Sequence, residues 1–466
     1  MPRPEKLLDR LWLAAYDLSR VNNYKQIELK MKSPQIFSAL AAFALLFAGT
    51  PAAVHPQTAS TPLTPTQIAK MPVRALPIKD FKLLTSGTGW VSTGNRLLFT
   101  TDNGAHWKDI SPPNPNQDHY ASVFFHNVDT GWVLSPHSDN FEDWTFNIYY
   151  TVDGGISWNK GNIPEWKYDR EKGERGLVDH GIIAFADKEH GWLSLDVEGN
   201  TMFASSTLLS TSDGGRTWHN TPDCINSRDN GPEGTIEAIL AKTDKEVWVV
   251  GSPEGLSALY VSKDGGGCFQ ELSLTAPNDV GHRGKPSYSV PVFEDSMHGY
   301  EAATYSGGKA DKSVSVLFQT DDDGRTWKSD RTLSNLAMGE TVATTVIDST
   351  WILPFAPQGS QPTLVKLHSN DRIAATIHKS SGDFNNCDLS FLTADEGWMN
   401  CSGNLSSTID GGATWTAIAP RVRSGSLNGV LTTDPITPVP APKPMKAYPI
   451  KLAEPKLPSE PATSVK

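Results

Sequence analysis

The sequence lacks several patterns that would identify a function directly. Its 12 histidines form no metal-binding spacing such as HExxH, and its four cysteines are not spaced as zinc ligands. No glycine-rich phosphate loop precedes a helix, because the Gly-Gly pairs belong to turn motifs. We therefore expect neither a metal nor a cofactor.

Basic residues are scarce in the central part of the chain. Residues 53–420 contain 27 Lys and Arg against 45 Asp and Glu. A body with this excess of negative charge repels phosphate backbones, which argues against nucleic-acid binding.

Long hydrophobic runs are also missing. The apolar run Ile36–Ala48 has 13 residues, which is too short to span a bilayer comfortably. Lysines precede it around Met31, and the small residues Thr50–Ala53 follow it. The pattern predicts a cleavable secretory signal within residues 1–53, and so a periplasmic or extracellular protein. The alternative is an uncleaved membrane anchor, and we interpret residues 1–30 as an over-long gene start.

One motif is abundant. Ser/Thr-x-Asp-x-Gly-x-x-aromatic, here called the box, occurs six times. The box aspartates are Asp102, Asp153, Asp213, Asp264, Asp322 and Asp410. The box aromatics are Trp107, Trp158, Trp218, Phe269, Trp327 and Trp415. The intervals between the aspartates are 51, 60, 51, 58 and 88 residues, so the last interval has room for a missing copy.

A second marker, Gly-Trp or a near variant, precedes each box. It occurs seven times, 42 to 60 residues apart, at Trp90, Trp132, Trp192, Trp248, Tyr300, Trp351 and Trp398. Trp351 has no box behind it. The two markers together predict seven units, of which the sixth lacks the box.

Each unit reads as four short strands. In the third unit we expect strands over residues 181–187, 191–197, 207–213 and 216–222, from alternating apolar residues and Gly/Asp-rich turns. Four-stranded units of about 50 residues predict an all-β, seven-bladed β-propeller over residues 79–420. The box falls at the turn between the third and fourth strands, where Gly supplies positive φ and Asp accepts backbone N–H groups. We interpret it as structural.

The flanking segments differ in composition from the repeats. We expect a linker at residues 54–78 and an extended or disordered Pro/Lys-rich tail at 421–466, where nine prolines lie between Pro435 and Pro461. The four cysteines suggest two disulfides. Cys387 and Cys401 flank a predicted hairpin and would face each other, and Cys224 with Cys268 follows by elimination.

The two markers together resemble the Asp-box (bacterial neuraminidase repeat) propellers. Within these, the pattern "GW … T-x-DGG-x-x-W" is similar to the photosystem II assembly and stability factor-like family. The resemblance covers about three quarters of the chain. It implies a seven-bladed, non-catalytic scaffold in an extracytoplasmic space, which aids assembly of a membrane complex through protein contacts.

Function is expected on the face opposite the boxes, where the loops joining second to third strands and successive units meet. Two neighbouring loops there are long and rich in aromatic and charged residues. The candidate binding surface is Asp139, Glu142, Asp143 and Trp144 in one loop, and Trp166, Tyr168, Arg170, Glu174 and Arg175 in the other. Such a surface suits a protein interface or a sugar platform. The alternative is a pair of solvated loops whose tryptophans pack on the blade.

Glycoside hydrolysis is the rival function, because sialidases share the box. A resemblance to sialidases implies an arginine cluster and an Arg-Ile-Pro motif, and residues 73–78 (VRALPI) lack that motif. Asp139, Glu142 and Asp143 are the carboxylates that could supply an acid–base pair, although carboxylates in an acidic loop are usually solvated. Asp321–Asp323 is an acidic turn that we considered for calcium and set aside. We therefore expect a monomeric, non-catalytic protein with a protein partner, and carbohydrate as the alternative ligand.

Overall fold

The computed structural model describes residues 73–423, with gaps, and residues 430–431. The gaps are 115, 140–142, 168–174, 201–202, 222–223, 225–230, 279, 281–285, 306–312, 337–344, 348, 356–362, 369–374 and 379–386. The predicted signal region, most of the predicted linker and most of the predicted tail lie outside the described residues.

The described residues form antiparallel sheets, each built from consecutive strands. Sheet 1 contains β2 (Asp80–Thr85), β3 (Thr88–Ser92), β4 (Leu97–Thr100) and β5 (Lys108–Asp109). Sheet 2 contains β6 (Ser122–Phe125), β7 (Gly131–His137), β8 (Thr145–Thr151) and β9 (Asn159–Gly161). Sheet 3 contains β10 (Leu177–Phe185), β11 (Gly191–Asn200), β12 (Phe203–Thr211) and β13 (His219–Asn220). Sheet 4 contains β14 (Thr235–Ala241), β15 (Val247–Ser252), β16 (Ala258–Ser262) and β17 (Phe269–Leu272).

The remaining repeats continue the same order. Sheet 5 contains β18 (Pro286–Tyr288), β19 (Val292–Phe293), β20 (Gly299–Tyr305), β21 (Ser313–Thr320) and β22 (Lys328–Leu336). Sheet 6 contains β23 (Thr345–Ile347), β24 (Thr350–Phe355), β25 (Thr363–His368) and β26 (Ala375–His378). Sheet 7 contains β27 (Cys387–Phe391), β28 (Gly397–Cys401), β29 (Asn404–Thr408) and β30 (Thr416–Ala417).

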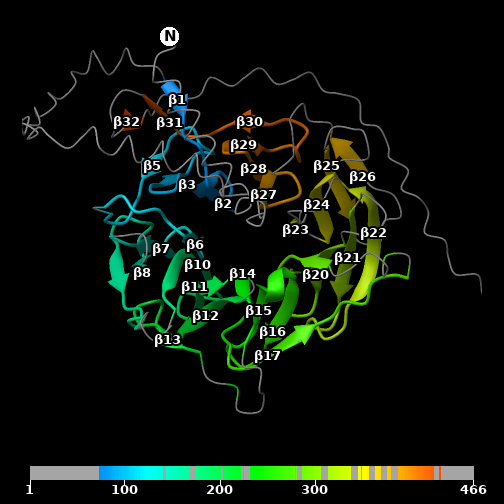
Figure 1. The fold of residues 1–466 in the computed structure, drawn as a ribbon. Coiled ribbons are helices and arrows are strands. Elements are labelled where there is room, and N and C mark those ends of the chain that lie inside the picture. The colour runs from blue at the N-terminus through cyan, green and yellow to red at the C-terminus, as the bar shows by residue number, and fades with distance from the viewer. Residues whose placement is uncertain are drawn as a thin grey trace, which may run out of the picture. The chain divides into compact units, whose positions relative to one another are not determined.

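The sheets are arranged as a β-propeller, with the first strand of each toward the centre and the last toward the rim (Figure 1). Six of them are four-stranded blades, as the sequence predicts. Sheet 5 departs from the prediction because two short strands, β18 and β19, both pair with β20. Pro291 lies between them and has no N–H to donate to a ladder, which explains the interruption.

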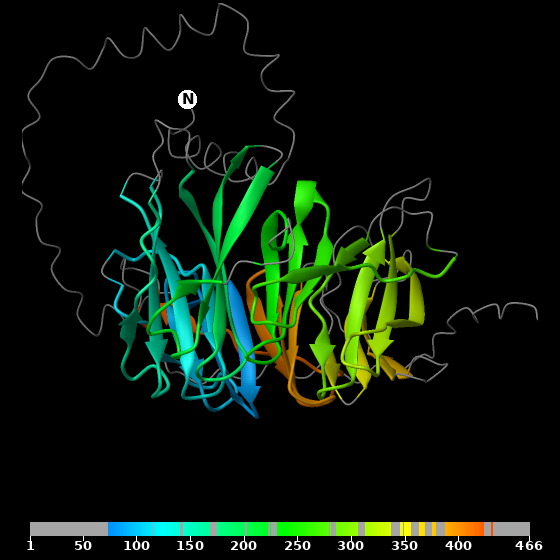
Figure 2. The same ribbon diagram turned by 90° about the horizontal axis from the view of Figure 1, so that it is seen from below.

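Sheet 3 has the longest strands of the first four sheets. Its hairpin β11–β12 stands above the neighbouring strands when the propeller is seen from the side (Figure 2). The described part of the chain holds one short 3-10 helix, η3 (Pro253–Gly255), and none of its helices has the length and apolar character needed to cross a membrane.

The box forms the turn between the third and fourth strands, as expected. In sheet 3, Thr211 Oγ1 donates to Asp213 Oδ1 (2.8 Å) and accepts from Gly215 N (3.1 Å). Asp213 Oδ1 also accepts from Thr217 N at 2.9 Å. Gly215 has a φ of 81°, which favours glycine. The carboxylate therefore ties the two ends of the turn together.

Acid is expected to remove this contribution. Hydrogen bonds from Ser157 and Thr151 lower the pKa of the box residue Asp153 to about 2. A carboxyl with a depressed pKa stabilises the fold above its unfolded pKa and loses that effect as pH falls through the folded value. The destabilisation caused by Asp153→Asn, measured by urea unfolding, should be largest near neutral pH and shrink between pH 4 and 2.5. A loss independent of pH would contradict this role.

In sheets 2 and 3 the tryptophan of the Gly-Trp marker joins the sheet to the box of the next sheet. Trp132 of β7 stacks on Phe185 with ring centroids 3.5 Å apart, and its Nε1 donates to Gly214 O at 2.9 Å. Trp192 likewise donates to Gly265 O at 3.0 Å. At these two junctions the marker and the box, which look independent in the sequence, form one inter-sheet contact.

The glycine of the marker is required by the close packing of a phenylalanine ring. A Cβ on Gly191 would lie 2.5 Å from the Phe185 ring, which packs across the backbone of the hairpin. The same contact recurs at Phe125–Gly131, Phe293–Gly299 and Phe391–Gly397. Sheets 4 and 6 have no phenylalanine at this place, and there the marker has no glycine.

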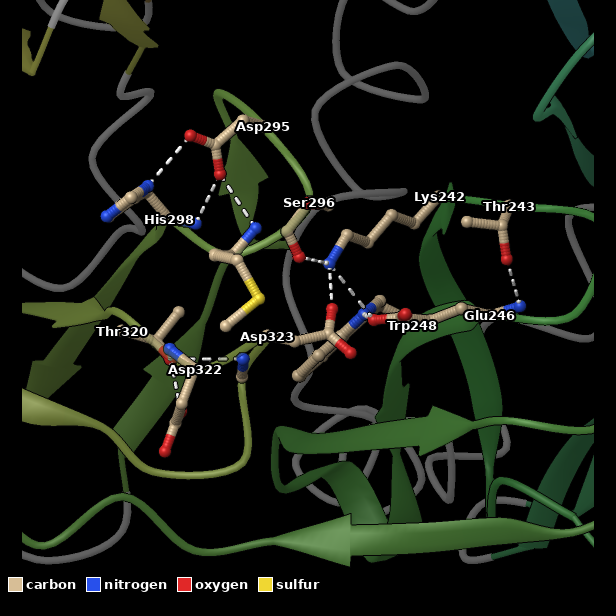
Figure 3. A network of polar contacts seen from close by, with 12 residues as sticks. Lys242, Thr243, Glu246, Trp248, Asp295, Ser296, His298, Thr320, Asp322 and Asp323 are labelled. Atoms are coloured by element: carbon tan, nitrogen blue, oxygen red, sulfur yellow. Dashed lines mark hydrogen bonds and ion pairs between the residues drawn. The ribbon is translucent and has the colours of Figure 1, made fainter.

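The junction of sheets 4 and 5 combines ring packing with charges, because the Trp248 ring also lies 5.5 Å from Phe293 and 6.0 Å from Trp327 between centroids. Glu246 accepts from Trp248 Nε1 (2.7 Å) and lies 2.8 Å from Lys263 Nζ. Asp323 occupies the position just before the box glycine, where four of the six boxes have a second glycine; its φ is 65°, and it pairs with both Lys242 and Lys263. Figure 3 shows Lys242 directed between Glu246 and Asp323, with Ser296 O as a further acceptor. The acidic turn considered for calcium therefore contributes one carboxylate to an ion-pair network.

The first and last sheets meet through side chains. Leu83 N donates to Ser390 Oγ at 3.2 Å, and Trp398 Nε1 donates to Asn103 Oδ1 at 2.8 Å. Trp107 and Trp398 pack with ring centroids 6.0 Å apart. These contacts close the ring.

A small extra sheet lies outside the repeats and corrects the predicted boundaries. β1 (Val73–Ala75) pairs with β31 (Arg421–Arg423), which pairs with β32 (Val430–Leu431). Ile78, placed in the linker by the sequence, is 3% exposed and belongs to the core under sheets 1 and 7. Strands of two or three residues with partners about 350 residues away leave no periodic signal, so the linker and tail were both drawn too long.

Both disulfides are present. Cys387 and Cys401 are direct partners in the β27–β28 register, with Cα atoms 4.2 Å apart. Cys224 bonds to Cys268, so the segment after sheet 3 is joined to the box of sheet 4.

Candidate functional site

The two long loops identified from the sequence lie on the face opposite the boxes. One joins β7 to β8 and the other joins β9 to β10. Asp139, Asp143, Trp144, Trp166 and Arg175 are described. The other four predicted residues, Glu142, Tyr168, Arg170 and Glu174, lie outside the described residues.

Trp166 is held in place while its ring stays accessible. The side chain is 38% exposed, and its Nε1 donates to Arg175 O at 3.0 Å. Arg175 in turn donates to Glu198 O at 3.2 Å, and Gly176 N donates to Glu198 Oε2 at 3.2 Å. The end of β11 therefore holds Arg175 and Gly176 in place, and the Arg175 carbonyl in turn holds the Trp166 ring.

Trp144 occupies a more buried position. It packs against the hydrophobic core shared by sheets 2 and 3, and its ring meets His119 edge-on at 6.4 Å. For Trp144 the interpretation as a residue that packs on the blade is therefore correct, whereas Trp166 is open to a partner.

Histidine–carboxylate pairs lie on sheets 2 and 3, one of them beside Trp144, and the sequence did not predict them. His137 Nδ1 lies 3.0 Å from Asp118 Oδ2, and its Nε2 lies 3.5 Å from the fully exposed Asp139. His119 Nε2 lies 3.9 Å from Asp179 Oδ2. A signal was available, because the dipeptide Asp-His occurs just before the first strand or within its start in both sheets, at residues 118–119 and 179–180.

His180 and Ser206 share one carboxylate. His180 Nδ1 lies 2.7 Å from Asp196 Oδ2, and Ser206 Oγ donates to Asp196 Oδ1 at 2.5 Å. The bond to Asp196 raises the pKa of His180. A nucleophilic serine needs a base at its own oxygen. Here Ser206 instead donates to Asp196 and accepts from Ile236 N at 2.8 Å, so the three residues brace sheets 3 and 4.

Within the described parts of the chain, no three His, Cys, Asp or Glu side chains come together as ligands for a metal. What the described face offers is an accessible tryptophan, a neighbouring arginine and exposed carboxylates. The fold and this face together define a β-propeller with a loop-built polar and aromatic surface.

Comparisons with known proteins find similar solved structures but no related sequence. No family profile matches the sequence, and no curated protein matches it. Among solved structures, YCF48 bound to D1 peptide is 15% identical, covers 73% of this chain and 94% of its own, and has a TM-score of 0.43. YCF48 from Cyanidioschyzon merolae is 17% identical, with coverages of 71% and 97% and a TM-score of 0.40.

A glycoside hydrolase is found at the same level. The GH74 xyloglucanase from Xanthomonas campestris is 11% identical, covers 74% of this chain and 54% of its own, and has a TM-score of 0.49. Identities this low speak to the fold alone, and at these TM-scores none of the three decides between binding and catalysis.

Proposed function

We propose that the protein is an exported, non-catalytic propeller of the Asp-box type, which binds a protein partner through the loop face of sheets 2 and 3. We further propose that the five-stranded sheet 5 counts as one blade, which makes the ring seven-bladed. The observation that carries the binding role is the exposed but hydrogen-bonded Trp166 beside Arg175.

An immobilised aromatic residue suits recognition of a protein surface. A side chain that is already ordered loses little conformational entropy when a partner covers it. Tryptophan and arginine are the residues most enriched among those that dominate binding energy. The binding of a D1 peptide by YCF48 is consistent with such a surface.

Catalysis finds less support on this face. A glycosidase needs two carboxyl groups placed on either side of the bond to be cleaved. Asp139 is 97% exposed at the loop and pairs only loosely with His137 at 3.5 Å. Carbohydrate binding without hydrolysis remains the alternative, because exposed tryptophans also stack on sugars.

Trp166→Ala is expected to weaken partner capture by about tenfold or more, the usual cost of truncating a dominant tryptophan. Capture from a cell-envelope extract on immobilised protein, quantified for each retained protein, measures this. The melting temperature should stay within about two degrees of wild type, because the ring is solvent-exposed.

Trp144→Ala serves as the matched comparison. Its ring packs on the core, so this variant should lower the melting temperature measurably. Equal capture by wild type and Trp166→Ala would mean that the binding surface lies elsewhere. Turnover of a fluorogenic glycoside would place the protein among the enzymes.

A further inference from the structure

A concave site lies on the loop side of sheets 4 and 5, away from the Trp166 loops. It is a cavity of about 320 Å³ between the turn after β15, the end of β17 and the start of β18. Tyr288 N donates to Ser257 Oγ at 3.0 Å, which fixes β18 against the turn after β15. The cavity is at the lower end of the size range of binding pockets, and it suits a single side chain or a small ligand.

The lining combines acidic and aromatic groups. Glu233, Glu271, Tyr260 and Tyr288 line it; the two tyrosines reach it from the core, 5% and 9% exposed, and Leu256 is 41% exposed at the edge. Among the described lining residues, none is Lys, Arg or His. The carboxylates therefore meet no opposite charge from within this lining.

The pocket is built close to the backbone. A Cβ on Gly251 would lie 2.8 Å from Glu233 O and 3.1 Å from the Tyr260 ring. A Cβ on Gly234 would lie 2.2 Å from Ser252 O. These two glycines let the Glu233 segment approach the sheet and bring its backbone close to Tyr260.

Buried polar groups continue beneath Tyr288. Tyr288 pairs with Ala303 in the β18–β20 register, and Glu301 and Tyr305 lie on the same face of β20 as Ala303. Glu301 is 1% exposed, and within the described structure its Oε2 and the Tyr305 hydroxyl have no hydrogen-bond partner. Burial raises the pKa of Tyr288, and the nearby Tyr305 and Glu301 add to this effect.

We infer that this cavity binds the guanidinium group of an arginine side chain supplied by a polypeptide partner. Glu233 and Glu271 accept its N–H groups, and the tyrosines flank its planar face. Carboxylates match the fork of a guanidinium, and aromatic faces attract organic cations. The lining carries negative charge without a positive partner among its described residues, which favours a cationic ligand over a neutral sugar.

The inference rests on the proposed function only in naming a polypeptide as the source of the cation. The pocket does not include Trp166, so the two proposals fail separately. Loss of guanidinium binding leaves the Trp166 capture result untouched, and an unchanged Trp166→Ala variant leaves the pocket titration valid.

The test uses N-acetyl-arginine amide and its neutral isostere N-acetyl-citrulline amide, titrated into the whole protein at low salt by calorimetry. Only the arginine compound should bind saturably. Glu233→Gln and Glu271→Gln should each weaken its Kd by about three- to tenfold, as expected for a partly exposed charge-assisted hydrogen bond. Glu237→Gln makes the same charge change on an exposed position of β14 outside the lining, and should leave the Kd within about twofold.

Several outcomes would overturn the inference. These are no saturable binding, equal binding of citrulline, equal effects of Glu237→Gln and Glu271→Gln, or binding of xylose or cellobiose in place of arginine. Thermal unfolding of each variant shows whether a loss reflects misfolding, and Tyr260→Phe, which keeps the ring, should keep the binding. If free methylguanidinium binds as tightly as a Gly-Gly-Arg-Gly-Gly peptide, a small guanidine rather than a polypeptide is the ligand.

Discussion

Replacing Trp132 with alanine is expected to lower the free energy of unfolding by about 3–5 kcal/mol, the usual cost of truncating a buried tryptophan. The side chain is 1% exposed, stacks on Phe185 of sheet 3 and donates to Gly214 O. The variant therefore loses both ring packing and the link to the next box. Urea unfolding followed by tryptophan fluorescence and circular dichroism measures the change.

Two further variants separate the parts of this contact. Trp132→Phe keeps an aromatic ring but not the N–H, and should lose less than the alanine variant while leaving Gly214 O without its donor. Trp166→Ala removes the same side chain from an exposed position and should cost less than about 1 kcal/mol. If Trp132→Ala costs no more than Trp166→Ala, the Gly-Trp marker does not hold neighbouring sheets together.

Lys242→Met is expected to cost about 2–3 kcal/mol, because removing one partner of a buried ion pair leaves charges uncompensated. The Lys242 side chain is 9% exposed, as is that of Glu246, which lies 3.5 Å from its Nζ. Lys263 remains to offset part of the loss, since it contacts both Glu246 and Asp323. Chemical unfolding at neutral pH gives the difference.

The neighbouring lysine supplies the control. Lys245→Met lies three residues away on the exposed part of the same turn and should change stability by less than about 0.5 kcal/mol. Adding Asp323→Gly to Lys242→Met should recover part of the loss, because it removes a carboxylate that has lost one of its two lysine partners and places glycine at a positive φ. Equal effects of the two lysine variants, or no recovery in the double variant, would show that the network is not coupled.

The repeats made the architecture predictable from the sequence. Alternating residues and the box located the strands of sheet 3 to within a few residues, and Trp351 indicated a sheet where the box is missing. Both markers are local, and local patterns survive in a single sequence. The disulfide Cys387–Cys401 was accessible for the same reason, because its loop is one hairpin.

Contacts between distant segments could not be predicted from the sequence. The sequence shows Glu246 before Trp248 and Asp323 in a box as two separate irregularities, and only the structure shows that they compensate each other. The cavity beside Tyr288 collects residues from Glu233 to Tyr288, with no spacing rule to connect them. On the loop face, the composition identified Trp144 and Trp166 alike, while burial distinguishes their roles.

The closing contact between sheets 1 and 7 has a consequence for the order of folding. Each sheet consists of consecutive strands and can form locally, but Trp398 meets Asn103 across 295 residues of chain. Long-range closure is entropically slow and must wait for both ends. A chain growing from its N-terminus therefore remains an open arc until sheet 7 exists, with the Trp107 side of sheet 1 uncovered. Any chain that ends before Trp398 leaves the apolar surface around Trp107 exposed. Such chains are expected to associate with one another through this surface.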